Sequence, residues 1–148
     1  MHYFTCIAAI GSLLSWAVTT QADTYPSGPY VHYFDKDHHY ALMYGFVLEA
    51  RVQVAYLNCT NKADAFSSTP FPTYPLPPKP GIKAYKMGMD NETYDAMVEY
   101  ALTYCGRFGY TKHHTEDFWY MLYDIKGNYM NVTYQGGFLN LSSDMPTL

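Results

Sequence analysis

The sequence predicts an α+β domain in which one or two helices pack against a small antiparallel sheet, held by one disulfide. Three observations support this fold class. Short β-prone runs recur along the chain, one segment has a helical hydrophobic period, and two cysteines remain after an apparent leader is removed. The β-prone runs are residues 30–34, 52–57, 82–87, 118–125 and 129–134.

The first 22 residues have the composition of a secretory signal peptide. They contain no Asp, Glu, Lys or Arg, residues 7–18 are apolar, and the segment ends in Thr20-Gln21-Ala22. The apolar run is shorter than the roughly 20 residues that cross a bilayer. We therefore expect cleavage after Ala22, secretion of a single domain over residues 23–148, and no membrane partner.

Overall composition bounds the partners further. The formal net charge is −4, which does not suggest a basic nucleic-acid-binding surface. Seventeen tyrosines in 148 residues are unusually many. Tyrosine combines a large apolar ring with a polar tip, so it suits both half-buried strands and contact surfaces.

The first half of the chain predicts strands separated by less regular segments. Residues 23–29 are rich in Pro, Gly and Ser and are expected to be an irregular segment before the first strand. Asp37 is a suitable N-cap for a partly helical segment over 38–51. A strand from Phe46 is the alternative for that segment. Residues 52–57 alternate and lead into Cys59, and residues 61–68 read as a loop. Six prolines in 69–81 exclude a helix and a central strand, which leaves a polyproline ligand or an edge strand over 71–76.

The second half contains the clearest helix and hairpin. Asp90 or Asn91 caps a helix over 90–105, and Gly106 is a natural residue just after its end. Its apolar face is predicted to carry Tyr94, Met97, Val98, Ala101, Leu102 and Cys105. Residues 118–125 and 129–134 form a hairpin, and residues 138–148 form a short strand and a tail.

Cysteines and sequons fit a secreted chain. Cys6 leaves with the signal, so Cys59 and Cys105 are expected to pair, with a pair of free thiols as the alternative. Four Asn-x-Thr/Ser sequons are glycan acceptors if exposed, and some of them can be chance occurrences. The candidate asparagines are Asn58, Asn91, Asn131 and Asn140.

The chain shows no catalytic or metal-binding motif. His38-His39 and His113-His114 are adjacent pairs, and adjacent side chains point apart on a helix or strand, so we expect no metal. The carboxylates each have a structural interpretation, and no phosphate-binding glycine loop or Gly-x-Ser-x-Gly elbow occurs. We expect no cofactor. The carboxylates considered are Glu49, Glu92, Glu99, Glu116 and Asp117.

The order of elements resembles a known group of proteins. "FPTYPL" (71–76), Ala-Tyr-Lys-Met-Gly (84–88) and "WYMLYDIKGNYMNVTYQGG" (119–137) follow one another. This order is similar to that of the small secreted guanyl-type ribonucleases of fungi, and more so to the RNase-like secreted effectors of powdery mildews. The resemblance implies a ribonuclease-like sheet, although the cysteine positions and the helix before the hairpin depart from the pattern.

The same resemblance implies loss of catalysis. In these ribonucleases catalysis depends on a general-base Glu, an Arg and a general-acid His. The corresponding positions here are Thr73, Tyr120 and Tyr134, and none of these side chains can do the work of the residue it replaces. The resemblance therefore implies a non-catalytic fungal virulence effector that is secreted, with translocation into the host cytoplasm as a further possibility. It would bind a host protein, and RNA weakly, to suppress immunity.

The expected binding face carries Thr73, Tyr74, Tyr120 and Tyr134. Two alternatives stay open at this point. One is an active secreted hydrolase or ribonuclease that uses carboxylates with His113 or His114. The other is a structural secreted glycoprotein.

Overall fold

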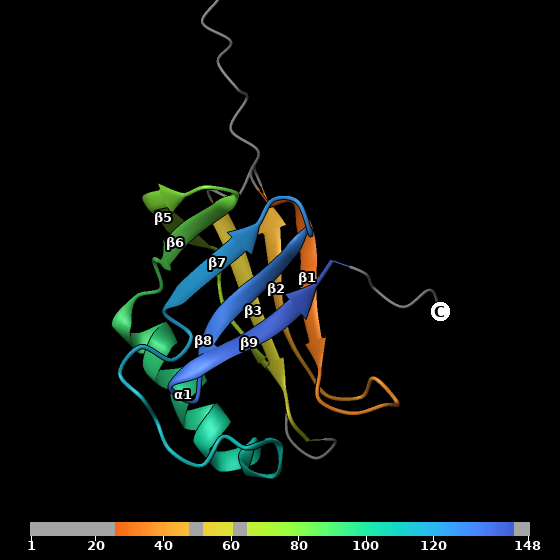
Figure 1. Cartoon of the computed structure of the whole chain (residues 1–148). Helices are drawn as coiled ribbons and strands as arrows, with labels where there is room; N and C mark the ends of the chain where they lie inside the picture. Colours follow the sequence, from red (N-terminus) through yellow and green to blue (C-terminus); the bar gives the residue numbers. More distant parts are fainter. Residues whose placement is uncertain (1–25, 48–51, 61–64, 144–148) are drawn as a thin grey trace, which may run out of the picture.

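The described part of the backbone forms a closed antiparallel barrel of eight strands with one α-helix at one end (Figure 1). The computed structural model describes residues 26–47, 52–60 and 65–143. The strands follow the order β2-β1-β9-β8-β7-β6-β5-β3, and β3 pairs back onto β2, which closes the sheet. A two-residue strand, β4 (Phe66–Ser67), adds to β3 beside the barrel. The barrel strands are β1 (Gly28–Tyr33), β2 (Ala41–Val47), β3 (Val52–Asn58), β5 (Phe71–Lys79), β6 (Ile82–Met87), β7 (Tyr120–Asp124), β8 (Tyr129–Tyr134) and β9 (Gly137–Ser142).

The expected α+β, ribonuclease-like fold is therefore wrong. A layered fold has an open sheet with helices on one face, whereas this sheet curls until its first and last strands pair. Its two faces become an inside and an outside, and the inside is filled by side chains of the strands themselves. Closure pairs every barrel strand on both sides, although β5 pairs with β3 only at its first two residues.

Residues 38–47, the described part of the segment 38–51, do not form the expected helix. Over 42–47 the buried side chains are Leu42, Tyr44 and Phe46, which recur every second residue as in a half-buried strand. β2 pairs with β1 on one side and with β3 on the other. Pairing on both sides overrides the weak helical period that Gly45 already disfavoured. Residues 48–51 lie outside the described part of the chain.

The proline-rich segment forms β5, which is longer than the edge strand expected over 71–76. β5 pairs with β6 over most of its length, with an irregularity between Leu76 and Lys79. On its other side it pairs with β3 only at Phe71 and Pro72. Prolines are tolerated here because most of this strand needs hydrogen bonds on one side only.

The barrel interior is filled by side chains of its strands. Along most barrel strands alternate residues point inward and are mostly large apolar or aromatic side chains, whereas β5 buries only Phe71. Two polar atoms there, the Tyr44 hydroxyl and Oε1 of Gln53, have no hydrogen-bond partner among the described residues. The fully or nearly fully buried strand residues include Tyr30, Leu42, Tyr44, Ala55, Leu57, Tyr85, Met87, Met121, Met130, Val132 and Leu141.

The predicted helix and disulfide are both confirmed. α1 (Asn91–Tyr104) begins after Asp90, whose carboxylate accepts the backbone N–H of Thr93 at 2.7 Å. Cys105 follows the helix and forms a disulfide with Cys59, the residue after β3. The bond ties α1 to the barrel end where β3, β6 and β8 finish. One expected face residue, Leu102, is instead 44% exposed. A short 3₁₀ helix, η1 (Gly106–Phe108), follows Cys105.

The expected signal peptide, residues 1–22, lies outside the described residues. Within the part of the chain that the structure describes, no helix has the length and apolar character needed to cross a membrane.

Candidate functional site

A row of three side chains crosses the outside of β5, β6 and β7. Tyr74 lies opposite Lys86, and Lys86 lies opposite Tyr120. Directly opposed residues of antiparallel strands project to the same face. Their chain neighbours Tyr85 and Met121 are buried in the barrel, so this row is on the outside. The three strands lie side by side in Figure 1.

A second, apolar row runs parallel to the first. Leu76 lies opposite Ala84, and Ala84 lies opposite Leu122. Trp119 precedes β7, and its ring lies 5.1 Å from Nζ of Lys86, measured to the ring centroid. We call this surface the outer β5–β7 face and define it by Tyr74, Leu76, Ala84, Lys86, Trp119, Tyr120 and Leu122. Tyr74 is 55% exposed, and the other members are half-buried.

The structure brings together only two of the four residues expected to form a binding face. Tyr74 and Tyr120 belong to the outer β5–β7 face. Thr73 lies opposite the buried Met87 and so faces the other way from Tyr74. Tyr134 is 8% exposed and packs in the core. The three ribonuclease-equivalent positions, Thr73, Tyr120 and Tyr134, therefore form no cleft.

Tyr134 belongs instead to a buried group near the α1 end of the barrel, the tyrosine–aspartate cluster of Tyr94, Tyr110, Asp117 and Tyr134. The Asp117 side chain is almost fully buried. One of its oxygens accepts the backbone N–H of His114, and the other accepts that of Gly136, both at 2.9 Å. The Tyr94 hydroxyl donates to the Asp117 carbonyl at 2.8 Å. These bonds join α1, the segment before β7 and the β8–β9 turn.

Burial in this cluster shifts the tyrosine pKa values upward. Desolvation, followed by the nearby Asp117 carboxylate, raises the pKa of Tyr94 and of Tyr134 to about 12 each. The same two causes raise the pKa of Tyr110 further. All three phenols stay protonated at neutral pH, so the cluster acts as a structural network. Sequence reasoning placed Asp117 in a turn, and nothing in the sequence indicates that its carboxylate is buried.

A pocket of about 370 Å³ opens beside this cluster. It lies at the β8–β9 turn, where Gln135 and Gly136 both have positive φ, as a two-residue hairpin turn of this type requires. The His114 ring lies close to Gly136. A Cβ at residue 136 would come within 3.0 Å of Nδ1 of His114. The lining residues are His114, Thr115, Glu116, Asp117, Thr133, Gly136, Gly137 and Phe138.

This pocket contains residues that the hydrolase alternative would use. His114 and Glu116 line it, whereas Nδ1 of His113 lies 3.4 Å from the Tyr110 hydroxyl. The Asp117 carboxylate is already engaged by two backbone N–H groups. The arrangement offers one imidazole and one exposed carboxylate around a small open space.

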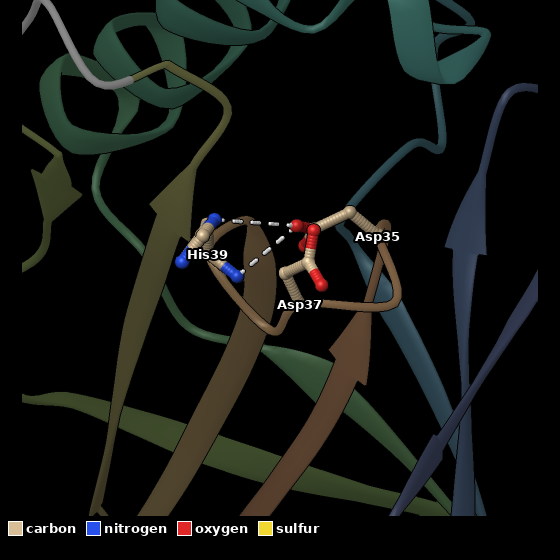
Figure 2. Close-up of side chains that lie close together, drawn as sticks. All are labelled: Asp35, Asp37 and His39. Atoms are coloured by element: carbon tan, nitrogen blue, oxygen red, sulfur yellow. Dashed lines mark hydrogen bonds and ion pairs between the residues drawn. The ribbon is translucent and has the colours of Figure 1, made fainter.

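Asp35, Asp37 and His39 come together in the turn between β1 and β2, as Figure 2 shows. One ligand atom from each lies within 4.8 Å of the others. Asp35 accepts the backbone N–H of Tyr40 at 2.9 Å and that of His39 at 3.3 Å. Burial alone would raise the pKa of Asp35, but these N–H groups outweigh it and lower that pKa below its ordinary value.

The hydrogen bonds that Asp35 accepts close this turn without an ion. Asp37 and His39 are exposed, and exposed acidic groups commonly lie together without a metal. His39 Nδ1 lies 3.8 Å from the Asp35 carboxylate, at a surface where such a pair contributes little.

The four sequon asparagines lie in different settings. Nδ2 of Asn58 donates to the carbonyl of His39 at 3.1 Å, and Asn91 is exposed at the start of α1. Asn131 and Asn140 lie opposite each other on the outside of β8 and β9, where Nδ2 of Asn140 donates to Oδ1 of Asn131 at 3.1 Å.

No protein-family model, curated protein or solved structure matches the chain. A function is therefore inferred from the geometry of the barrel and its surface.

Proposed function

We propose that the chain is a secreted, non-catalytic protein that binds another protein through its outer β5–β7 face. The observation that carries the proposal is the cross-strand row Tyr74–Lys86–Tyr120 with Trp119 beside it. Tyrosine and tryptophan are enriched where protein interfaces concentrate their binding energy. They bury a large area while losing few rotatable bonds.

The scaffold supports this role because it holds the aromatic groups in place. The Tyr74 ring lies against Gly88. A Cβ at residue 88 would come within 2.8 Å of Cε2 of Tyr74. The Trp119 ring packs against Tyr94 with 4.7 Å between ring centroids. Side chains that are already ordered lose less entropy when a partner binds.

Two further features support secretion. The composition of residues 1–22 fits a signal peptide, and the Cys59–Cys105 disulfide fits an oxidising route. We propose that the partner is a host protein and that the chain acts as an effector in virulence. The ribonuclease-like fold is not part of this proposal. RNA is the weaker candidate, because Lys86 is the one charged member of the face and the net charge opposes phosphate binding.

Site-specific photo-crosslinking tests the proposal. A benzophenone amino acid is placed at Tyr74, at Tyr120 or, as a control, at Tyr104, which is 41% exposed on α1. The proteins are then mixed with an extract of the tissue that receives the secreted chain. We expect one discrete adduct from Tyr74 and Tyr120 and none from Tyr104. Excess wild-type protein should suppress the adduct, and the Tyr74→Ala/Tyr120→Ala variant should not.

Two outcomes would overturn the proposal. An adduct of equal yield from the Tyr104 position would show that the contact is not confined to the face. Full suppression by the Tyr74→Ala/Tyr120→Ala variant would show that the two rings contribute nothing to the contact.

A second candidate function is hydrolysis, and the pocket at the β8–β9 turn is the observation that favours it. A His114 imidazole beside the Glu116 carboxylate could transfer protons to a small ester or glycoside. Turnover that His114→Ala abolishes and Tyr74→Ala/Tyr120→Ala leaves intact would establish this candidate over protein binding.

A further inference from the structure

Three of the four sequons share a feature that the glycosylation signal itself does not require. Each has an aromatic residue two positions before the asparagine: Tyr56 before Asn58, Tyr129 before Asn131 and Phe138 before Asn140. These pairs lie on β3, β8 and β9. On a strand, residues two apart point to the same face, about 7 Å from each other. Each of the three asparagines therefore has a ring beside it.

Phe138 and Asn140 form the most accessible of these pairs. Leu139 and Leu141 turn toward the core, so Phe138 and Asn140 face outward from β9. Phe138 is 60% exposed, the largest value for a large hydrophobic side chain among the described residues. By contrast, Tyr129 is half-buried and its hydroxyl donates to Asp124 at 3.3 Å, so that ring already has a partner.

The surroundings of Phe138 suit a carbohydrate. One face of a sugar ring presents C–H groups, which pack on the electron-rich face of an aromatic ring. Phe138 is also a wall of the pocket of about 370 Å³, where Thr115, Glu116 and His114 offer polar groups. An oligosaccharide attached at Asn140 would cross Phe138 before it reaches these groups.

We propose that Asn140 carries an N-linked glycan whose first N-acetylglucosamine packs on the Phe138 ring. The inference rests on the proposed secretion, because the donor is a lipid-pyrophosphate oligosaccharide of the secretory pathway. The Asn140 amide nitrogen forms a bond to C1 of the sugar and loses one proton. The bond from C1 to the pyrophosphate oxygen breaks, and the lipid pyrophosphate leaves. The cell's oligosaccharyltransferase catalyses this transfer.

The neighbouring residues accommodate this modification. After glycosylation the Asn140 amide keeps one N–H, so it retains a donor beside Oδ1 of Asn131. The Thr133 hydroxyl, which belongs to the Asn131 sequon, donates to the Glu116 carbonyl at 2.5 Å and accepts the Tyr120 N–H at 3.0 Å. Asn131 therefore presents its sequon only before folding, whereas Asn140 is exposed in the folded chain.

Mass spectrometry and melting temperatures test the inference. The full chain is expressed in a cell line that makes only high-mannose glycans, with its own signal and in parallel with a heterologous one. Asn58→Gln, Asn91→Gln and Asn131→Gln leave Asn140 as the single acceptor, and an endoglycosidase trims its glycan to one sugar. We expect a glycopeptide containing Asn140. We also expect the trimmed protein to melt about 2 to 5 °C above the Asn140→Gln protein.

Phe138→Ala supplies the decisive comparison. The substitution should lower the melting temperature of the trimmed protein to that of the Asn140→Gln protein. It should leave the melting temperature of the Asn140→Gln protein itself unchanged. A matched control keeps Asn91 as the single acceptor, since Met89 precedes it in place of an aromatic residue. Phe138→Ala should not alter any effect of that glycan. The same comparison in the chain with all four sequons intact guards against misfolding of the multiple variant.

An unmodified Asn140 in secreted protein would overturn the inference, and so would an advantage that survives Phe138→Ala. Retention of the chain with its own signal, together with modification of the chain with the heterologous signal, would refute the proposed secretion and with it a glycan on the native protein. The packing of a sugar at Asn140 on Phe138 would then still be tested by the chain with the heterologous signal.

Discussion

Successive residues of β7 and β8 lie on opposite sides of one barrel wall and differ in chemistry. On the inside, Met121 and Met130 are fully buried and pack with the other inward side chains. On the outside, Tyr120 and Asn131 are half-buried and adjoin a lysine, a tryptophan and a second asparagine. The difference indicates that the inside holds the fold together and the outside is available for partners and glycans. Substitutions on the two sides should therefore affect different properties.

The largest contrast should come from shortening one inner and one outer side chain. Met130→Ala removes a fully buried side chain and leaves a cavity, so we expect the free energy of unfolding to fall by about 2 to 5 kcal/mol. Leu122→Ala, on the outside, should cost less than Met130→Ala. Urea unfolding followed by circular dichroism measures both. Equal losses would mean that the wall has no distinct inner side.

Alkaline pH should act through the tyrosine–aspartate cluster. The pKa values of Tyr94 and Tyr134 are about 12 in the folded chain and about 10 when unfolded. The unfolded chain therefore loses these protons first, so stability is full below pH 10 and falls as the pH rises from 10 to 12. Melting temperatures across this range, with tyrosinate absorbance, measure the effect.

Tyr134→Phe should flatten this pH dependence, and Tyr74→Phe, on the outside, is the matched control. If wild type and Tyr134→Phe lost stability identically between pH 10 and 12, the burial of the Tyr134 hydroxyl would not be the cause.

A smaller gain is expected at Tyr44. Its hydroxyl is buried and has no hydrogen-bond partner among the residues described here, so Tyr44→Phe should raise the free energy of unfolding by about 1 kcal/mol. Tyr110→Phe should lower it, because the Tyr110 hydroxyl lies beside Asp117 and His113. Thermal unfolding distinguishes the two. A loss of stability in Tyr44→Phe would show that its hydroxyl has a partner.

The smallest effect on stability is expected on the outer β5–β7 face. Tyr74 is 55% exposed, so Tyr74→Ala should change the free energy of unfolding by less than about 0.5 kcal/mol. The same substitution should reduce partner binding, whereas Tyr104→Ala on α1 should change neither property. A large loss of stability in Tyr74→Ala would mean that this ring serves the fold.

Local patterns predicted the elements that depend on nearby residues. The α1 helix follows from its period and its Asp90 cap, and the hairpin of β7 and β8 follows from two β-prone runs around a turn. The disulfide follows from two cysteines in a chain that the sequence predicts to be secreted. Each of these inferences needs only composition and spacing over a short stretch.

Closure of the barrel depends on contacts that no short stretch contains. β2 and β3 complete the ring by pairing with each other while β3 also meets β5. The inward position of Tyr134 depends on register: Asp124 pairs with Tyr129, so Met121 and Val132 share the inner face. Tyr134 shares the side of Val132, and Tyr120 lies on the other. The four-residue turn sets this register, and its conformation could not be read from the sequence.

The most direct test of protein binding by the outer β5–β7 face is the affinity of the crosslinked partner, once purified, for three forms of the chain. Isothermal titration should give at least a tenfold weaker Kd for Tyr74→Ala/Tyr120→Ala than for wild type, since two aromatic contacts are lost. Tyr104→Ala should bind like wild type. Equal affinity for all three forms would contradict the assignment of binding to this face.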